Sequence, residues 1–447
     1  MQQQNTTFAN KILASFLALV LSFTLVATPA GSAFAETRST DVVVSDTVGT
    51  LGLIASEAPN IFASNAFLAT SDGTILFSRD ADAQVKIASL TKIMTAIVAL
   101  DNSTLDKSII VSANAVATGG SNAGLSSGDT MPLSEALCAL MVPSGNDAAT
   151  AIAECVGKDL ANTTDDTAGY NAFIAKMNEK AAELGCTNTK FTNPHGLDAD
   201  EFESDSHCSA KDLFLMVQYA MKNDTFRAAV THDTYELSYT NNGEAKTKTL
   251  TSTDELLGVF DGACGIKTGT TDLAGYCFAG ACERNGVMLY AIVLGSTDDS
   301  TRFEDTKTLF NWYFNGLVDY KLSNAENDIV ANVSNSAWLD KTVPAKLQDP
   351  TATVNVFKYD GNISQNFNFK QISGDVKAGD VLGTVDFIQN NKIISTQNLV
   401  AAEDCDAPDF GSSVGIGFTR FIHNFTGEKN AADNQIFNDT PLLIKFS

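Results

Sequence analysis

The order of hydrophobic and polar positions divides the chain into a first region of mixed helices and strands and a second region of strands. Between residues 89 and 100, apolar side chains lie on nearly every side of a predicted helix, which is typical of a buried helix. Apolar spacing and cap residues predict further helices at 133–141, 147–156, 170–184, 209–221 and 302–314. Apolar runs next to turn residues predict strands at 66–70, 74–78, 263–269, 274–281 and 287–295. The helices therefore lie inside a frame of two early and three late strands.

The second region begins near residue 328 and is rich in strand signals. Strands are predicted at 352–358, 382–388 and 393–399, with a turn at 389–392 between the last two. These signals predict a separate small all-β domain at 326–410. The tail at 411–447 is ambiguous, because five apolar residues would share one face of a short helix: Val414, Phe418, Phe421, Ile422 and Phe425.

Residues 1–35 have the pattern of a secretory signal peptide. Lys11 supplies a positive charge, an apolar run follows at 12–27, and Ala33-Phe34-Ala35 has the form of a cleavage site. The alternative is an uncleaved membrane anchor, for which the apolar run is short. We therefore expect an exported chain, in which a segment without clear periodicity at 36–60 is a linker and a large domain occupies 61–320.

Composition and charge narrow the classes of function. Apolar residues make up 44% of the 447 residues and charged residues 18%, which indicates a globular protein. The net charge of −24, from 53 acids and 29 bases, argues against general binding to nucleic acid or to an anionic membrane surface, because both need a basic face. A basic cluster in a pocket would be especially informative in so acidic a chain.

The cysteines and histidines give no support for a metal site. No two of the eight cysteines have C-x-x-C spacing, and the four histidines are scattered along the chain. Disulfides are allowed in an exported protein, but composition alone does not decide their pairing.

The first candidate for chemistry is the stretch Ser89-Leu90-Thr91-Lys92. Residues i and i+3 share a face of a helix, so Ser89 and Lys92 are expected one turn apart. A serine hydroxyl is a weak nucleophile that needs a base within hydrogen-bond reach. A lysine becomes such a base when burial and a nearby cation lower its pKa, and a lysine on an apolar helix meets the first condition. The alternative is a helix cap with a lysine whose amine reaches solvent.

The second candidate is Ser144-Gly145-Asn146, which follows Pro143 in a tight break between two predicted helices. There the hydroxyl could relay a proton toward a leaving group, and the amide could hold a substrate carbonyl. The alternative is a plain turn that caps the next helix.

The third candidate is Lys267-Thr268-Gly269, at the end of a predicted strand. Lys267 would keep Lys92 neutral by charge repulsion and would also attract a carboxylate. Gly269 would let a substrate backbone approach the strand edge. The alternative is a strand end with a solvated lysine.

The three motifs occur in the order S-x-x-K, S-x-N and K-T-G, as in β-lactamases and penicillin-binding proteins. From about Asn65 to Leu399 the chain resembles the low-molecular-mass penicillin-binding proteins, the D-alanyl-D-alanine carboxypeptidases. The stretches that carry the resemblance are ASLTKIMTA at 88–96, PSGNDAA at 143–149, NPHGLD at 193–198, and GIKTGTT at 265–271 followed by Ala274-Gly275. The resemblance implies an α+β fold with an antiparallel five-stranded sheet flanked by helices, followed by the small all-β domain.

The resemblance also implies an activity and a location. The chain would be a serine-type carboxypeptidase that removes the terminal D-alanine from peptidoglycan stem peptides through an acyl-enzyme on Ser89. It would bind β-lactams and would need neither a metal nor an organic cofactor. We expect it outside a bacterial cell, in the cell wall or at the outer face of the cytoplasmic membrane.

Residue roles follow from the matching positions. Ser89 would be the nucleophile, Lys92 its base and Ser144 a proton donor. The backbone N–H groups of Ser89 and Thr270 would form the oxyanion hole. The residues expected to bind substrate are Asn146, Lys267, Thr268, Gly269, Thr270, Thr271 and Arg302.

Two of these expectations concern the terminal carboxylate of the substrate, which Thr271 and Arg302 would hold. A salt bridge at a helix start is the alternative for Arg302. His195 is expected to shape its loop by hydrogen bonding rather than to take part in the chemistry.

Three other functions remain open. A D,D-endopeptidase would use the same site on cross-linked peptides. A class A-like β-lactamase shares the motifs but normally has Asp at the position of Gly145 and lacks the β domain. A catalytically slow penicillin-binding sensor or wall-binding protein is the third, although the intact Ser89, Lys92 and Lys267 argue against it.

The chain departs from the family in two respects. Residues 441–447 look like a strand, whereas members held at the membrane often end in a basic amphipathic helix, which weakens the expectation of membrane attachment. The eight cysteines are also more than the family leads us to expect. A predicted hairpin near Thr271 suggests one disulfide and two weaker hypotheses suggest others, with free buried cysteines as the alternative: Cys264 with Cys282, Cys138 with Cys155, and Cys186 with Cys208.

Overall fold

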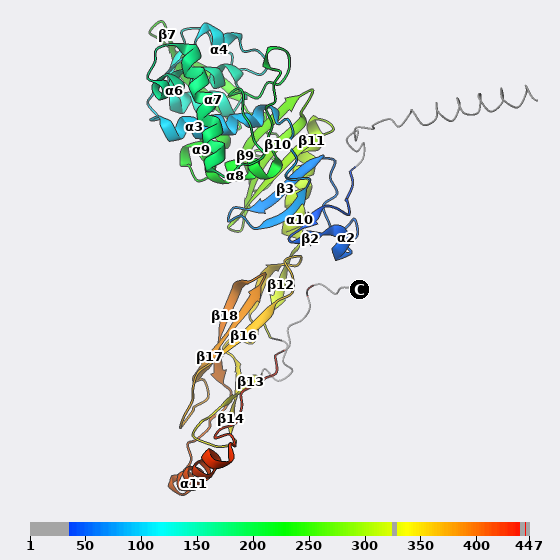
Figure 1. Cartoon of the computed structure of the whole chain (residues 1–447), viewed down its shortest axis with the longest axis vertical. Helices are drawn as coiled ribbons and strands as arrows, with labels where there is room; N and C mark the ends of the chain where they lie inside the picture. Colours follow the sequence, from blue (N-terminus) through cyan, green and yellow to red (C-terminus); the bar gives the residue numbers. More distant parts are fainter. Residues whose placement is uncertain (1–34, 324–328, 439–442, 444–447) are drawn as a thin grey trace, which may run out of the picture.

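The computed structural model describes residues 35–323, 329–438 and 443. A first part, with helices around a sheet, is followed along the chain by an elongated part made mostly of strands (Figure 1). The predicted signal peptide up to residue 34 and the predicted strand at 441–447, apart from residue 443, lie outside the described residues.

The first part is built on an antiparallel sheet with the strand order β2-β1-β4-β3-β11-β10-β9. Its strands are β1 (Val42–Val43), β2 (Asp46–Thr47), β3 (Asn65–Thr70), β4 (Ile75–Arg79), β9 (Ala263–Thr271), β10 (Gly275–Arg284) and β11 (Val287–Ser296). The five strands from β4 to β9 in this order are the five that the sequence predicts. The strand β9, which carries the K-T-G motif, lies at one edge of the sheet.

Helices cover both faces of this sheet. Their bounds are α2 (Val48–Leu51), η1 (Ala88–Thr91), α3 (Lys92–Asn102), α4 (Ala113–Ala117), α5 (Leu133–Met141), α6 (Asn146–Ala161), α7 (Asp166–Glu183), η2 (Asp200–Phe202), α8 (Ala210–Ala220), α9 (Asp224–Val230) and α10 (Asp299–Asn315). Side chains alternate along β3, so that Phe67 and Ala69 join a core shared with α3, α5, α6 and α8, whereas Ala66 and Leu68 join a core shared with α10. A small second sheet lies beside the helices and consists of β5 (Ser108–Ile110), β6 (Thr130–Pro132), β7 (Thr234–Asn241) and β8 (Glu244–Thr251).

The helices predicted from the sequence are present, with shifted ends. Helix α10 begins three residues earlier than predicted, because the side chain of Asp298 accepts a hydrogen bond from the N–H of Thr301 and caps it. Ser209 caps α8 as predicted. The predicted helix at 89–100 begins instead as the 3₁₀ turn η1 and becomes an α-helix only at Lys92.

The prediction of a linker at 36–60 is wrong in part. This segment contains β1, β2 and α2, and β1 adds to the sheet next to β4. The segment is held by an ion pair between Asp41 and Arg79, whose side chains are each 1% exposed. Its elements are two to four residues long, too short to produce a period in the sequence.

The second part is a small β domain, as predicted. Its strands are β12 (Leu317–Lys321), β13 (Ile329–Ser334), β14 (Thr342–Leu347), β15 (Thr353–Phe357), β16 (Ser364–Phe369), β17 (Val381–Gln389), β18 (Lys392–Ala401) and β19 (Gln435–Ile436). The turn predicted at 389–392 joins β17 to β18, and Asn390 and Asn391 adopt positive φ there, as tight hairpins require. The two parts also touch directly, because Lys392 in this hairpin pairs with Asp72 in the turn between β3 and β4.

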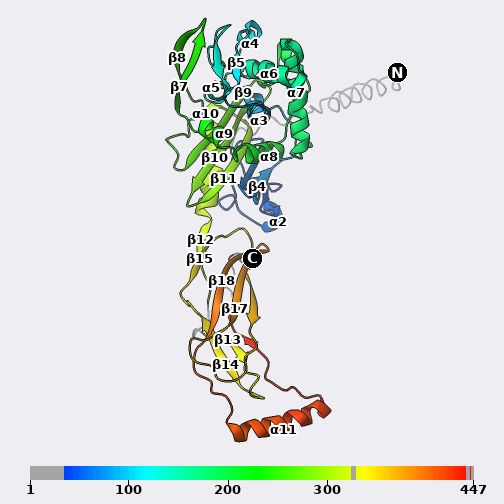
Figure 2. The same cartoon turned by 90° about the vertical axis from the view of Figure 1, so that its left-hand side faces the viewer.

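Helix α11 (Phe410–Thr426) occupies most of the segment that the sequence left ambiguous. It lies across the end of the β domain farthest from the first part (Figure 2). The predicted apolar face exists and is exposed, from 42% at Ile422 to 77% at Phe425, and Phe410 at the start of the helix is exposed as well. After the helix the chain returns, and β19 pairs with β13. Within the described residues, no helix is both long and apolar enough to cross a membrane.

The predicted disulfides are absent, because all eight cysteines are free. Cys264 and Cys282 lie on neighbouring strands, but a register shift places Cys282 opposite Ala263, and the two thiols face different cores. The other cysteines make hydrogen bonds of their own; for example, the thiol of Cys186 donates to the carbonyl of Asp212. The alternative of free cysteines is therefore correct, and six of the eight are buried, whereas Cys264 and Cys405 are partly exposed.

The buried pair of Asp41 and Arg79 leads to a prediction about stability. In Asp41→Asn the Arg79 guanidinium stays buried without its counter-charge, so the free energy of unfolding should fall by about 3–5 kcal/mol in denaturant titrations. Glu179→Gln, which removes an exposed ion pair with Lys176 within one helix, is the control and should leave stability unchanged. Equal stability of the two variants would contradict an anchoring role for Asp41.

Candidate active site

Ser89 and Lys92 lie on one face at the junction of η1 and α3. The Nζ of Lys92 is 2.8 Å from the Oγ of Ser89, 2.5 Å from the Oδ1 of Asn146 and 3.0 Å from the carbonyl oxygen of His195. The side chain of Lys92 is 0% exposed. The structure therefore excludes the alternative of a lysine that reaches solvent.

The surroundings of Lys92 suit an uncharged amine. Burial lowers its pKa well below the usual value, and the charge of Lys267 lowers it further, although Asp147 acts in the opposite direction. A neutral amine has two N–H groups and one lone pair. The acceptor oxygens of Asn146 and His195 can take the two N–H groups, which leaves the lone pair for the hydroxyl of Ser89.

Two residues of the site, Ala88 and Ser144, have a strained backbone conformation. Ala88, directly before Ser89, has φ of 48°, and Ser144 has φ of 64°, both in the left-handed region that costs energy for residues with a Cβ. Gly196 packs beneath this point, and a Cβ on it would lie 1.9 Å from the carbonyl oxygen of Ala88. The 193–198 loop thus fixes the turn that presents Ser89.

The second motif reaches the site from the start of α6. Ser144 is 4% exposed. Asn146 is expected to hold a substrate carbonyl, but here its side chain binds the protein, with Oδ1 on Lys92 and Nδ2 donating to the carbonyl of Gly119. The amide positions the amine of Lys92, and substrate contact by Asn146 stays a prediction.

Asp147 is a residue that the motif analysis missed. Its buried carboxylate accepts hydrogen bonds from the backbone N–H groups of Ala123, Leu125 and Ala148, at 2.9–3.0 Å. These bonds fix the loop that follows α4 and so place Gly119 against the amide of Asn146. A carboxylate directly after the motif was the available signal.

The third motif lies on the edge strand β9, directly beside η1. Lys267 is 1% exposed, and its Nζ donates to the carbonyl of Thr268 at 3.1 Å. Burial and the nearby charge of Arg302 lower the pKa of Lys267 to about 7, while Asp254 raises it. The alternative of a solvated lysine at this strand end is therefore wrong.

Gly269 allows β9 and η1 to approach each other. A Cβ on Gly269 would lie 2.8 Å from the carbonyl oxygen of Ile87 and 3.1 Å from the N of Ser89. The sequence suggested that this glycine makes room for a substrate, and the structure adds that it makes room for the turn that carries the nucleophile candidate.

Arg302 reaches the same strand from α10. Its Nη1 donates to the hydroxyl of Thr270 at 2.9 Å and to the carbonyl of Gly269 at 3.3 Å, and its Nη2 pairs with Asp299. Arg302 is thus both part of the site and a salt-bridge partner within its helix. The hydroxyl of Thr271 points elsewhere and donates to Asp198 at 2.7 Å, so the structure brings Thr270, not Thr271, to Arg302.

The ring of His195 shapes its loop, as predicted. Its Nδ1 accepts from the N–H of Leu197 at 3.2 Å, and the ring packs edge-on to Phe202. Burial, together with the charge of Lys92, lowers the pKa of His195 to about 3, so the ring is neutral. Its backbone carbonyl, rather than its ring, contacts Lys92.

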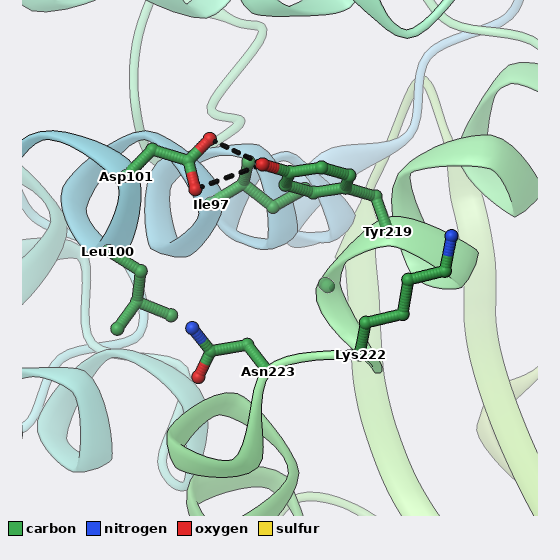
Figure 3. Close-up of a pocket in the computed structure, with 7 residues that line it drawn as sticks. Ile97, Leu100, Asp101, Tyr219, Lys222 and Asn223 are labelled. Atoms are coloured by element: carbon green, nitrogen blue, oxygen red, sulfur yellow. Dashed lines mark hydrogen bonds between the residues drawn. The ribbon is translucent and has the colours of Figure 1, made fainter.

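A cavity of about 240 Å³ lies at the other end of α3, away from Ser89 (Figure 3). The hydroxyl of Tyr219 donates to the carboxylate of Asp101 there, and Leu100 and Asn223 line the opposite wall. Asn223 itself caps α9 through Thr225 and Phe226. Tyr219, Asp101 and Asn223 thus make structural hydrogen bonds here, and none of the three motifs lines this cavity.

Comparison with known proteins identifies the family. The sequence profile of the D-alanyl-D-alanine carboxypeptidases matches residues 53–298, more than half of the chain. The chain belongs to this family. A second profile, that of the C-terminal domain of penicillin-binding protein 5, matches residues 321–407 of this carboxypeptidase.

Individual relatives agree with this membership. The carboxypeptidase is 28% identical to D-alanyl-D-alanine carboxypeptidase DacF of Bacillus subtilis over 76% of its own length and 84% of the relative. It is 34% identical to a D-alanyl-D-alanine carboxypeptidase of Streptomyces over 60% of its length and 93% of that protein. The crystal structure of the Streptomyces K15 DD-transpeptidase superposes with a TM-score of 0.54 at 33% identity, covering 57% of this chain and 98% of the other. These matches confirm the predicted fold class.

The contact between Gly269 and η1 leads to a second prediction. In Gly269→Ala the new Cβ would push against the carbonyl of Ile87 and displace Ser89, so covalent labelling by a fluorescent penicillin should slow at least about tenfold, which corresponds to about 1.4 kcal/mol in the barrier. Gly415→Ala is the control, since a Cβ there meets nothing within 4 Å. Equal labelling rates would show that the strand and the turn adjust without loss.

Proposed function

We propose that Ser89 is the nucleophile and Lys92 the general base of a serine-type D-alanyl-D-alanine carboxypeptidase that acts on peptidoglycan stem peptides. The observation that carries this proposal is the 2.8 Å approach of the Lys92 amine to the Ser89 hydroxyl, with the amine fully buried. Membership of the family gives the reaction class, and the geometry supports the roles that we propose for the residues.

The reaction is an acyl transfer to water. The Oγ of Ser89 attacks the carbonyl carbon between the two D-alanines while Lys92 takes its proton, and a tetrahedral intermediate forms. The backbone N–H groups of Ser89 and Thr270 stabilise the oxyanion. The C–N bond breaks, and the leaving amine receives the proton that Lys92 took, relayed through the hydroxyl of Ser144, so that Lys92 is neutral again. Water then attacks the ester on Ser89 while Lys92 takes its proton, and Lys92 returns this proton to the Oγ of Ser89 as the acyl group leaves.

The substrate's terminal carboxylate fits the cationic end of the site. Arg302 and Lys267 provide positive charge, and the hydroxyl of Thr270 accepts a hydrogen bond from Arg302. Strand β9 is at the edge of its sheet, so an extended peptide can pair with its free backbone groups. Thr268, Gly269 and Thr271 line this edge, and we assign them substrate contact on that basis.

Other reactions of the same acyl-enzyme remain alternatives. The relatives include a D-alanyl-D-alanine endopeptidase of Pseudomonas aeruginosa, 28% identical over 57% of this chain and 79% of that protein, and a structure named as a DD-transpeptidase. An endopeptidase or a transpeptidase reaction at this site would differ from the proposed one in the peptide or in the acceptor and would use the same acyl-enzyme. The edge strand and the cationic end favour a free terminal carboxylate and hence the carboxypeptidase.

Release of D-alanine from a pentapeptide ending in D-Ala-D-Ala is the test of this proposal. The mature chain should release D-alanine, and Ser89→Ala should reduce the rate to the uncatalysed background, because in the described part of the chain the hydroxyl bound to Lys92 is that of Ser89. Thr95→Ser, a buried hydroxyl on α3 that donates to the carbonyl of Pro194, is the control and should retain activity.

Each other outcome assigns a different function. Cleavage of cross-linked peptides without release from the pentapeptide would favour the endopeptidase. Rapid turnover of β-lactams without peptide cleavage would favour a β-lactamase. Stable labelling by penicillin without turnover of any peptide would favour a sensor.

We further propose that the enzyme works next to a lipid surface that α11 contacts. The helix exposes a continuous apolar face, and no acidic residue occurs between residues 410 and 426, although the chain as a whole carries a net charge of −24. An amphipathic helix with apolar residues on one face and without acids on the other binds in the interface plane of a bilayer. The position of α11 at the end of the β domain would hold the active site away from that surface (Figure 2).

Binding to vesicles tests this location. The mature chain should sediment with phosphatidylglycerol vesicles, and the double change Phe418→Ser and Phe425→Ser should abolish sedimentation, because both rings are more than 60% exposed and lose their contact with lipid. Activity on a soluble pentapeptide should be unchanged in this variant. Unaltered sedimentation of the double variant would contradict the assignment. If the wild type forms dimers and does not bind vesicles, and the double variant is monomeric, the apolar face serves self-association instead.

A further inference from the structure

Asp254 is a buried carboxylate that the reaction described above does not use. It lies in the segment that leads into β9 and is 5% exposed. Its Oδ1 accepts from the N–H of Leu256 at 2.9 Å, but its Oδ2, which is also buried, has no hydrogen-bond partner among the described residues. A buried carboxylate oxygen without a donor is costly and calls for an explanation.

The segment around Asp254 is tied to the catalytic motifs on both sides. The neighbouring Thr253 donates its N–H to the carbonyl of Val142, just before the second motif, at 3.3 Å. Its hydroxyl lies 2.6 Å from the hydroxyl of Thr268 in the third motif. These bonds hold Asp254 in a fixed position relative to the K-T-G strand.

The charges that face Asp254 come from two elements. Lys267 on β9 and Arg302 on α10 both act on the carboxylate, the thiol of Cys264 on β9 lies in range of its charge, and Glu255 follows it in the chain. Arg302 has its own carboxylate in Asp299. Lys267 forms no ion pair within the part of the chain that the structure describes, and its one hydrogen bond goes to a backbone carbonyl.

We infer that Asp254 is a positioning residue that keeps Lys267 charged, and thereby sets the upper pH limit at which the enzyme can bind a carboxylate and hold Lys92 neutral. Lys267 has both functions only while it is protonated. Burial and Arg302 act against its charge, and among the groups that act on it Asp254 is the one that favours it. The inference rests on the proposed function, since it concerns the same site.

The pH dependence follows in sign from these charges. Asp254 is itself held back from ionising, because burial raises its pKa to about 6, so the carboxylate is ionised in the range where Lys267, with a pKa of about 7, begins to lose its proton. Removal of the negative charge therefore lowers the pKa of Lys267. Activity should fall at a lower pH, and the acidic side of the profile, where Lys267 is charged in any case, should change little.

The experiment is the pH profile of Ser89 acylation by a fluorescent penicillin, measured on the full mature chain between pH 5 and pH 10. In Asp254→Asn the alkaline midpoint should move down by about one pH unit, because a single opposite charge nearby typically shifts a pKa by one to three units. At pH 8 this variant should acylate up to about tenfold more slowly than wild type, and at pH 5, where Lys267 is protonated in both proteins, it should nearly equal wild type. Asp254→Ser removes the charge but keeps an acceptor for Leu256, so it provides the same readout if the amide variant does not fold.

Glu154→Gln is the matched control. Glu154 lies on α6 and is 1% exposed; one of its oxygens is bound by Asn114, and the other has no hydrogen-bond partner in the part of the chain that is described. The alkaline midpoint of the Glu154→Gln profile should equal that of wild type. A uniform loss of rate at all pH values in the Asp254 variants, or an unmoved midpoint, would overturn the inference and leave only a structural role for Asp254.

The wild-type profile separates this inference from the proposed function. A wild-type chain that is never labelled would overturn both. A labelled wild type with an alkaline midpoint shared by Asp254→Asn and Asp254→Ser would overturn the role of Asp254 alone.

Discussion

The amine of Lys92 is sealed inside the protein between α3, the start of α6 and the 193–198 loop, and the rest of the site is arranged around it. A buried ammonium group without a carboxylate partner is expensive, so the uncharged form is favoured there. The acceptors placed on the amine are neutral oxygens of Asn146 and His195, and they account for two N–H groups and no more. The same burial that would be a liability in a structural lysine suits the base that we propose Lys92 to be.

Such a site needs rigid support, because its groups come from distant segments of the chain. Asp147 fixes one loop with three backbone hydrogen bonds, and Gly196 and Gly269 let two backbones approach the turn that carries Ser89. The left-handed conformations of Ala88 and Ser144 cost energy that the surrounding helices and sheet must offset. Strain at Ala88, directly before Ser89, and at Ser144 in the second motif indicates that the fold holds these residues in place and that local preference does not.

The sequence predicts the parts of this molecule that carry a local signal. The five long strands, the main helices, the hairpin at Asn390 and the apolar face of α11 all follow from periodicity and turn residues. The short strands at 42–47 do not, since they depend on a buried pair between Asp41 and the distant Arg79. The pairing of Cys264 and Cys282 could not be predicted for a similar reason, because a single register shift decides on which face of the sheet each thiol lies.

Within the site, short motifs identify which residues come together but not how their hydrogen bonds are shared. The spacing predicts that Ser89 and Lys92 meet, and they do. The spacing does not reveal that the side-chain carbonyl of Asn146 accepts a hydrogen bond from Lys92. It also does not reveal that Thr270, and not Thr271, reaches Arg302, because this depends on side-chain directions at the end of β9.

The two buried lysines show how the surroundings of a side chain decide its charge. Both are buried and both have lowered pKa values. Lys92 contacts neutral oxygens, and the carboxylate of Asp147 that acts on it is already bound by backbone N–H groups. The carboxylate that acts on Lys267 is that of Asp254, one oxygen of which has no hydrogen-bond partner among the described residues. The roles that we propose for the two lysines, a base and a cation, thus follow from the carboxylates around them, as environments divide acid and base roles between like groups.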